Sequence, residues 1–340
     1  MGSSILTDEY IQQESGVFLR KSSIPDLKKT DSIILDIDGV ILDVAASFRV
    51  AISQTTQFYF TNILKWNGKA ILVSPAETQS FKLAGGFNND WELTYAAVLF
   101  FLAKSVQFDN NNLDFLKNRG KSVKDFTKEV ATQGGGLKVA EKVIFLSVKQ
   151  AQADRIASLW DRAKIKRIFQ ELYAGTDYCK KLYGFDPQFV QEKGLINQEK
   201  VLLDAANLKP FYPRIGVLTG RTSEEADVAL DFAALRGMIS EDAIFCDDGG
   251  LTKPDPKILL DLGRILDTRV GIYLGDTVDD FRTVANFQDA QSNEQSSTRF
   301  LSAIITHKES ERDIYFGLRA DIVAEDPNKV LAAVSELKQG

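Results

Sequence analysis

The chain has 340 residues, enough for about two domains of ordinary size. Apolar residues make up 44% and charged residues 26%, which is the mixture of a folded globular protein. Lys and Arg number 41 against 47 Asp and Glu, and a net charge of −6 gives the chain no overall attraction to nucleic acid or anionic membranes. We therefore expect a folded, soluble protein that binds neither.

The rare residues exclude several kinds of chemistry. His307 is the only histidine, which argues against serine hydrolases, most zinc enzymes and two-histidine acid–base schemes. Cys179 and Cys246 are too few and too far apart for a disulfide framework or a Cys-x-x-Cys metal site. The longest apolar run, 95–103, is about half of the ~20 residues that a membrane span needs, and no signal-peptide pattern begins the chain. We therefore expect a cytoplasmic protein.

Five short apolar runs predict buried strands of a parallel sheet. They lack the alternation of half-buried strands and are rich in β-branched residues. The runs cover residues 32–37, 215–218, 243–246, 270–274 and 301–305. Helices are predicted between them: Thr222 begins a capping box whose helix Gly237 can end, and Asp255 and Pro256 form a second helix start. This alternation predicts a doubly wound α/β fold.

Residues 48–210 have a different pattern. Apolar residues recur at helical spacing, as at Ile165, Ile168 and Phe169, and three glycines at 134–136 predict a break between helices. We expect a helical insertion after the first strand of the core. The predicted organisation is an N-terminal segment of 1–30, a core of 31–47 and 211–340, and an insertion of 48–210. The polar stretch 288–298 is predicted to be an exposed loop.

Two carboxylates, Asp36 and Asp38, directly follow the first predicted strand in the sequence Asp-Ile-Asp-Gly-Val. Doubly wound sheets build their sites at the C-terminal ends of their parallel strands. One aspartate can attack an electrophile while the other handles the proton, and together they would attract a hard cation. Alone, the same pentapeptide also fits a calcium loop or a plain turn.

Two further motifs offer groups that would bind phosphate. The sequence Leu-Thr-Gly-Arg at 218–221 places the Thr219 hydroxyl and Gly220 just after a strand, which suits a phosphate oxygen. Lys253 lies in a Lys-Pro-Asp-Pro loop that two prolines stiffen. The alternatives are a helix N-cap turn at 218–221 and a solvated surface lysine at Lys253.

The fourth motif, Gly-Asp-Thr-Val-Asp-Asp at 275–280, also follows a predicted strand. Its carboxylates, Asp276, Asp279 and Asp280, suit magnesium, which prefers oxygen ligands. A capped helix start would have a similar sequence.

With these four motifs in this order, the sequence resembles the haloacid dehalogenase-like (HAD) superfamily. Within it, the chain is similar to the phosphatase branch with a helical C1-type cap, which includes phosphoglycolate phosphatase and β-phosphoglucomutase. The residues that carry the resemblance are Asp36 to Val40, Thr219, Lys253, Gly275, Asp276 and Asp280. The resemblance implies a Rossmann-like doubly wound parallel sheet core with an inserted all-helical cap domain, here the long insertion 48–210.

The resemblance also implies a role for each matched residue. Asp36 would be the nucleophile that forms an aspartyl-phosphate, and Asp38 would be the general acid and base. Thr219 and Lys253 would stabilise the charge on the transferring phosphoryl group. Because family dehalogenases lack the second aspartate, Asp38 argues against dehalogenation as the activity.

The implied cofactor is Mg²⁺. It would be held by the Asp36 carboxylate, the backbone carbonyl of Asp38 and the Asp276 carboxylate, with Asp280 supporting the site. Asp279 lies close enough in sequence for an exchange of roles with its neighbours.

Three residues are predicted to bind substrate. Gly220 and Arg221 lie beside the hydroxyl motif, and Lys82 lies in the insertion shortly before a predicted helix start at Asn89 or Asp90. For Lys82 the alternative is a loop lysine in water.

We therefore predict an Mg²⁺-dependent HAD-type phosphatase that acts on a small phosphorylated metabolite. Phosphoglycolate and sugar phosphates are candidate substrates from the resemblance. The alternatives are a phosphomutase of the β-phosphoglucomutase type and a non-catalytic binding or regulatory protein with the same fold. The sequence leaves the oligomeric state open.

Overall fold

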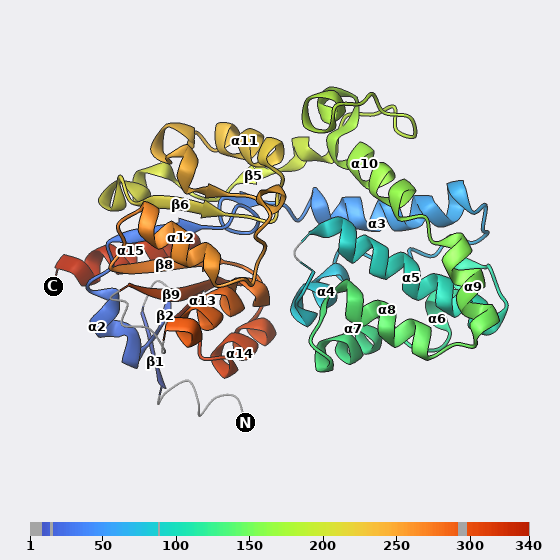
Figure 1. Ribbon diagram of the computed structural model, residues 1–340, viewed down its shortest axis with the longest axis horizontal. Coiled ribbons are helices and arrows are strands. Elements are labelled where there is room, and N and C mark those ends of the chain that lie inside the picture. The colour runs from blue at the N-terminus through green and yellow to red at the C-terminus, as the bar shows by residue number, and fades with distance from the viewer. Residues whose placement is uncertain (1–8, 14–15, 88, 292–297, 340) are drawn as a thin grey trace. The chain divides into compact units, whose positions relative to one another are not determined.

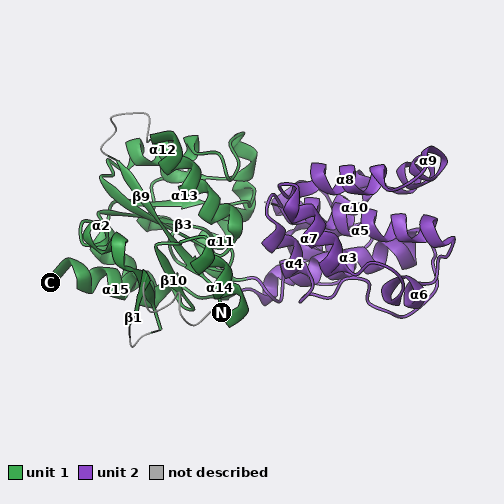
Figure 2. Cartoon of the chain, turned by 90° about the horizontal axis from the view of Figure 1, so that it is seen from below, with its two compact units in different colours: residues 1–43, 200–340 green, residues 44–199 purple. Residues whose placement is uncertain are grey.

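The computed structural model describes residues 9–13, 16–87, 89–291 and 298–339, and the chain divides into two compact units. Unit 1 comprises residues 1–43 and 200–340, and unit 2 comprises residues 44–199 (Figure 2). The chain leaves unit 1 along β4 (Leu42–Asp43) and returns along β5 (Lys200–Val201), and these two strands pair antiparallel. In this division, residues 44–47 belong to unit 2 and residues 200–210 to unit 1, whereas the expected insertion was 48–210.

Unit 1 is built on an eight-stranded sheet in the order β1-β2-β10-β9-β8-β3-β6-β7. The strands from β10 to β7 run parallel, while β1 and β2 are antiparallel additions at one edge. The bounds are β1 (Tyr10–Gln12), β2 (Phe18–Arg20), β3 (Ser32–Leu35), β6 (Ile215–Leu218), β7 (Ile244–Phe245), β8 (Val270–Gly275), β9 (Arg299–Ile305) and β10 (Ile322–Ala324). All five predicted strands are present, and the doubly wound parallel sheet is confirmed.

Helices flank this sheet (Figure 1). They are α2 (Ile24–Leu27), α11 (Ser223–Phe232), α12 (Lys257–Ile265), α13 (Val278–Gln291), α14 (Glu309–Gly317) and α15 (Pro327–Gln339). Helix α13 packs against β8 and β9, and α15 packs against β10 and α2. Short 3-10 turns complete the unit: η1 (Lys21–Ser23), η4 (Ala205–Phe211), η5 (Arg236–Met238), η6 (Glu241–Ala243) and η7 (Asp247–Gly249).

The helix ends differ in detail from those expected. Thr222 does cap α11 through a capping box with Glu225, but the helix ends at Phe232, before Gly237. Helix α12 begins one residue later than expected, with Pro256 as its N-cap. Helix α13 continues to Gln291, so residues 288–291 of the expected loop are helical, and residues 292–297 lie outside the described residues.

The described part of the N-terminal segment belongs to the core. Strand β2 pairs with β10, and β1 pairs with β2. The buried carboxylate of Asp321, just before β10, accepts hydrogen bonds from Arg20 and from Ser23 Oγ at 2.5 Å, and on its other oxygen from the Ser302 N–H at 2.9 Å. This network ties the N-terminal residues to the far end of the chain.

The regular elements in the described residues of unit 2 are all helices or helical turns, as the resemblance implied for the insertion. Its elements are α3 (Phe48–Phe58), the π-helical turn η2 (Tyr59–Ile63), α4 (Thr78–Ala84), α5 (Asp90–Phe108), α6 (Leu113–Asn118), α7 (Val123–Thr132), α8 (Gly136–Leu146), α9 (Gln150–Leu159), α10 (Arg162–Tyr183) and η3 (Leu195–Gln198). Helix α5 is almost wholly buried and packs against α3, α8, α9 and α10. Among the described residues, no helix is both long and apolar enough to cross a membrane.

The first and last residues of unit 2 are joined to each other. The Ser47 hydroxyl donates to Glu199 Oε1 at 2.9 Å, and the Tyr173 hydroxyl donates to the same oxygen at 3.1 Å. The predicted glycine break is also present, because α7 ends at Thr132 and α8 begins at Gly136.

Candidate active site

The motif residues gather at the point where the strand order of the sheet reverses. Strand β3 lies between β6 and β8, and Leu35 is in register with Val217 and Leu274. Asp36, Thr219 and Asp276 therefore follow neighbouring strands at the C-terminal ends of those strands. Doubly wound sheets bind their ligands at such a reversal, because the chain turns away to opposite faces and leaves a crevice.

A buried ion-pair network is the centre of this site. Lys253 Nζ lies 2.8 Å from Asp36 Oδ2 and 2.7 Å from Asp280 Oδ1. The side chains of Lys253, Asp36 and Asp280 are 6%, 5% and 0% exposed, so water contributes little to their solvation. The other oxygen of Asp36 accepts the Ile37 N–H at 2.7 Å. Lys253 is therefore not a solvated lysine, and it fixes the orientation of the Asp36 carboxylate.

Burial and neighbouring charges shift the pKa values of Asp36, Asp280 and Lys253 in different directions. Burial raises the pKa of Asp36 to about 7, against the opposing charge of Lys253. Burial acts to raise the pKa of Asp280 too, but the charge and hydrogen bond of Lys253 hold it below the usual value. For Lys253, burial acts to lower the pKa, but Asp280 and Asp36 raise it well above the usual value. The charges of Lys253 and Asp280 thus favour each other, the ammonium by raising its own pKa beside the carboxylates and the Asp280 carboxylate by a lowered pKa beside Lys253.

Asp280 is held by hydrogen bonds to both of its oxygens. Oδ1 accepts from Lys253 and from the Tyr273 hydroxyl at 2.6 Å. Oδ2 accepts from the Asp276 and Thr277 N–H groups and from the Thr277 hydroxyl, at 3.0, 2.9 and 2.7 Å. A carboxylate with this many donors orients its neighbours rather than reaching a ligand. Tyr273, in β8, is a site residue that the motif analysis missed.

The fourth motif brings Asp276 close to Asp36. One carboxylate oxygen from each of Asp36, Asp276 and Asp280 lies within 4.8 Å of the others. A Cβ on Gly39, where φ is +74°, would fall 2.4 Å from Asp276 Oδ2, so the backbone beyond Asp38 passes directly beside that carboxylate. The Tyr315 hydroxyl donates to the Asp276 carbonyl at 3.1 Å and supports the loop from the other side.

This group of residues suits a divalent cation such as Mg²⁺. Its donors are all oxygens, which is the ligand type that Mg²⁺ prefers. When ionised, the carboxylates of Asp36, Asp38, Asp276 and Asp280 outnumber the two cations, Lys253 and Arg221, by two charges. The side chains of Asp36 and Asp276, with the nearby backbone of Asp38, are the groups that would hold the ion. Asp279 lies outside the cluster, and its Oδ1 is 3.5 Å from Arg282 Nη1.

The hydroxyl motif, 218–221, contributes two buried side chains, Thr219 and Arg221. The Thr219 side chain is 3% exposed, and its hydroxyl accepts the Arg221 N–H at 3.2 Å. The Arg221 side chain is 1% exposed and contacts Asp38. Gly220, between them, is partly buried. The Arg221 side chain thus lies inside the protein, in contact with Asp38, the candidate acid–base residue.

Lys82 belongs to unit 2 and is described apart from the residues above. It lies on α4, where its Nζ is 2.7 Å from Asp90 Oδ1 in the first turn of α5. Asn89 caps that helix, as expected for a start at Asn89 or Asp90. The ion pair makes Lys82 an ordered, partly buried residue rather than a loop lysine in water.

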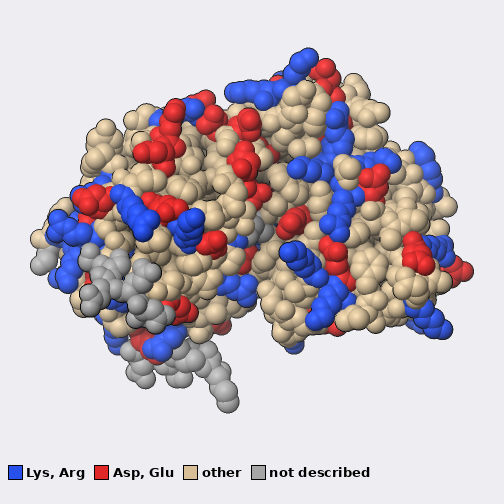
Figure 3. Space-filling model, viewed as in Figure 1, with Lys and Arg blue, Asp and Glu red and all other residues tan. Residues whose placement is uncertain are grey.

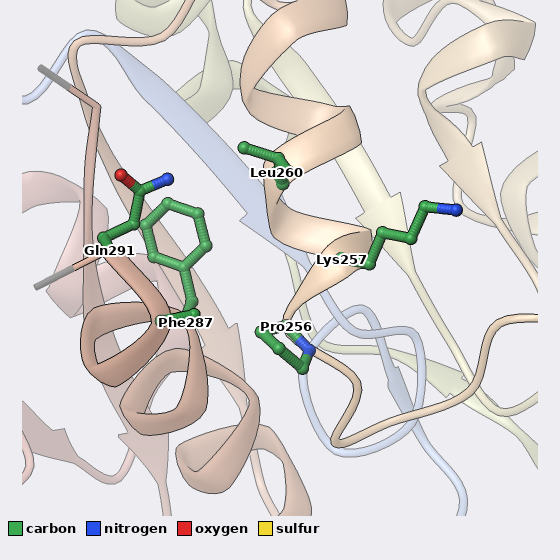
Figure 4. Close-up of a pocket in the computed structure, with 6 residues that line it drawn as sticks. Pro256, Lys257, Leu260, Phe287 and Gln291 are labelled. Atoms are coloured by element: carbon green, nitrogen blue, oxygen red, sulfur yellow. The ribbon is translucent and has the colours of Figure 1, made fainter. Parts of the chain in front are cut away.

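Two surface features lie outside this group. A small, mainly apolar pocket between α12 and α13 is lined by Pro256, Lys257, Leu260, Phe287, Ala290 and Gln291, and none of the candidate catalytic or metal-binding residues is among them (Figure 4). On the face drawn in Figure 3, Lys and Arg side chains gather over unit 2, whereas Asp and Glu are frequent over unit 1. On this face the two units therefore differ in the charge that they present.

Comparison with known proteins identifies the fold. No protein-family model matches the chain, and no curated protein matches it in sequence. Among solved structures, phosphatase Tt82 from Thermococcus thioreducens is 20% identical with a TM-score of 0.54, over 91% of this chain and 99% of the phosphatase. A structural-genomics target is 13% identical with a TM-score of 0.55, over 91% and 100% of the two chains.

A β-phosphoglucomutase from Clostridium difficile also matches, with 15% identity and a TM-score of 0.41 over 91% of this chain and 97% of the mutase. The two structures with TM-scores above 0.5, at identities of 20% and 13%, establish a shared fold and nothing finer. The chain therefore has the HAD-like fold that its motifs predict, a Rossmann-like core with an inserted helical unit.

Proposed function

We propose that the protein is an Mg²⁺-dependent phosphatase that hydrolyses a small phosphorylated metabolite through an aspartyl-phosphate on Asp36. The observation that carries this proposal is the buried contact of Lys253 with both Asp36 and Asp280, beside Asp276, at the reversal point of the sheet. A buried carboxylate, a fixed cation and a set of oxygen donors that suit a metal occur there together. Phosphoryl transfer needs this combination, because its catalysis depends on positioning and charge stabilisation.

In the first half of the proposed reaction, an Asp36 carboxylate oxygen attacks phosphorus. A new O–P bond forms, the bond to the ester oxygen breaks, and Asp38 gives that oxygen a proton. Lys253, held by Asp280, offsets the charge on the phosphoryl group, and the Thr219 hydroxyl is the proposed hydrogen-bond donor to one of its oxygens. Asp36 and Asp276 are the carboxylates that would hold Mg²⁺, which would supply positive charge to offset that of the phosphoryl group.

In the second half, water attacks the phosphorus of the aspartyl-phosphate. Asp38, now ionised, takes a proton from this water, the bond to Asp36 breaks, and inorganic phosphate leaves. The second half-reaction returns a proton to Asp38 and removes the phosphoryl group from Asp36, so the enzyme returns to its starting state. We propose that unit 2 acts as the cap that selects the substrate, with Lys82 among its recognition residues, and that phosphoglycolate and sugar phosphates are the first substrates to test.

The test is phosphate release from a panel of phosphate monoesters with Mg²⁺, compared between the native protein, Asp36→Asn and Asp313→Asn. Asp313 is an exposed residue of α14 and provides a matched control for loss of a carboxylate. We expect release that EDTA abolishes, a loss of about 1,000-fold or more in Asp36→Asn, and native activity in Asp313→Asn. No release by folded native protein would overturn the proposal. Isomerisation of a sugar phosphate that requires a bisphosphate activator would instead identify a mutase.

A further inference from the structure

Arg221 is the largest side chain that is fully buried in the described residues. Its Nε and Nη2 both lie 2.8 Å from Asp38 Oδ1, and the Asp38 side chain is 25% exposed. The guanidinium therefore faces the protein interior, while the carboxylate that it holds remains open to solvent on one side. A substrate-binding arginine has the opposite arrangement, with its own N–H donors exposed in the crevice.

The backbone around Arg221 is also fixed. Its N–H donates to Thr219 Oγ1 at 3.2 Å, and its carbonyl accepts the Asp247 N–H at 2.9 Å. The next residue, Thr222, is the N-cap of α11. Arg221 thus emerges from a short segment between β6 and α11 that has little freedom to move.

A buried guanidinium is costly unless a carboxylate compensates for its lost hydration. The pair with Asp38 supplies this compensation, and the planar guanidinium fixes the direction of the carboxylate more tightly than an ammonium would. In the proposed reaction, Asp38 must reach the leaving oxygen in one half and the attacking water in the other. A carboxylate free to rotate would spend less time in that position.

We infer that Arg221 is a positioning residue that holds Asp38 in place for both proton transfers, rather than a contact to substrate. The inference rests on the proposed phosphatase function and extends it to a residue outside the motif matches. It makes a specific prediction about coupling, because the inferred effect of the Arg221 side chain on proton transfer passes through Asp38.

The test is a double-mutant cycle on the hydrolysis of p-nitrophenyl phosphate, with Arg221→Met, Arg221→Lys, Asp38→Asn and the two double variants. We expect Arg221→Met to lower kcat by about 10- to 100-fold with little change in KM, which is the scale of a misplaced catalytic group. Arg221→Lys should recover part of the loss. In the Asp38→Asn background, either change at Arg221 should have no further effect on kcat.

A substrate contact predicts other results. It would raise KM, or it would lower kcat by the same factor whether or not Asp38 is intact, and either outcome overturns the inference while leaving the proposed function in place. An inactive native protein would instead overturn the proposed function and the inference together. If Arg221→Met does not fold, the cycle with Arg221→Lys decides by the same criteria.

Arg20→Met provides the matched control. Arg20 is a second largely buried arginine of unit 1, and it pairs with Asp321 away from the motif residues. Its loss should lower the thermal stability and leave kcat unchanged. A similar fall in kcat for Arg20→Met and Arg221→Met would show that destabilisation alone explains the effect, which would overturn the inference.

Discussion

Lys253 and Asp280 form a buried ion pair, with Lys253 Nζ 2.7 Å from Asp280 Oδ1 and the Asp280 side chain fully enclosed. The pair joins the proline-containing loop before α12 to the first turn of α13. Because Lys253 also contacts Asp36, the position of Asp280 determines the direction from which the cation approaches the proposed nucleophile. The pair therefore connects the stability of unit 1 to its proposed chemistry.

Replacement of Asp280 by Asn should impair both properties. The change leaves the Lys253 ammonium with one buried carboxylate instead of two, and removal of one partner from a buried pair costs about 3 kcal/mol or more of unfolding free energy. Denaturant unfolding and phosphate release measure the two effects. Asp279→Asn is the matched neighbour, since Asp279 is buried on the same turn but lies outside the carboxylate cluster. A larger loss of activity in Asp279→Asn than in Asp280→Asn would show that the two residues exchange roles.

Tyr273→Phe should lower activity with a modest loss of stability. The variant keeps the buried ring but removes the hydroxyl that donates to Asp280 Oδ1 at 2.6 Å, a hydrogen bond to a charged group worth about 2 kcal/mol. We expect kcat to fall by about tenfold as Asp280 and Lys253 shift. Tyr10→Phe is the control, since its hydroxyl donates to the Ala320 carbonyl at 2.7 Å in the same unit. Equal kcat in Tyr273→Phe and the native protein would remove Tyr273 from the site.

The four motifs and their strands could be predicted because each is a local pattern. A buried run such as 32–35 followed by Asp36 predicts both a strand and the residue at its end. The contacts between motifs could not be predicted in this way. Arg221 and Asp38 are separated by 183 positions, and nothing in the Thr-Gly-Arg sequence indicates that the arginine points inward. In the sequence, Tyr273 resembles any other buried aromatic residue of a strand. Its place in the site depends on α13, which positions Asp280 beside its hydroxyl.

Three strands at one side of the sheet could not be predicted from the sequence for a related reason. Strands β1, β2 and β10 have three residues each, too few to show a period. Strand β2 also depends on β10, which lies at the other end of the chain. The polar residues 288–291 are helical because α13 packs through Phe287 and its other apolar residues against β8 and β9, and this packing overrides their composition.

Asp321→Asn should destabilise unit 1 without affecting the chemistry. The buried Asp321 carboxylate binds Arg20, Ser23 and Ser302, and the variant leaves the Arg20 cation without its counter-charge. We expect a loss of about 3 kcal/mol in unfolding free energy and faster proteolysis near β1 and β2. Glu9→Gln, which removes an exposed partner of Arg319, should change stability by less than about 0.5 kcal/mol. Similar losses in the two variants would contradict the role given to Asp321.

Lys104 should make the stability of unit 2 depend on pH. Burial lowers its pKa to about 8 in the folded chain, although its Nζ donates to the Lys121 carbonyl at 3.0 Å. The unfolded chain keeps this proton to a higher pH, so it binds more protons than the folded chain between about pH 8 and the usual lysine pKa. The unfolding free energy should therefore rise with pH across that window.

Lys104→Met removes this cost and should stabilise the chain at neutral pH by about 2 kcal/mol, with a flatter dependence on pH. Thermal unfolding at several pH values measures the difference from the native protein. Lys128→Met, at an exposed position of α7, is the control and should follow the native curve. A Lys104→Met variant that is less stable than the native protein at neutral pH would show that the ammonium is well accommodated in the fold.

The most direct test of the proposed chemistry is to trap the phosphoryl group on the chain. Native protein is mixed with Mg²⁺ and a substrate ester, quenched in acid within one turnover, digested and analysed by mass spectrometry, with Asp36→Asn treated in the same way. We predict one added phosphoryl group on the peptide that contains Asp36, labile to hydroxylamine and absent from the variant. Phosphate release by native protein with no phosphorylated peptide, or with the phosphoryl group on another residue, would contradict the assignment of Asp36 as the nucleophile.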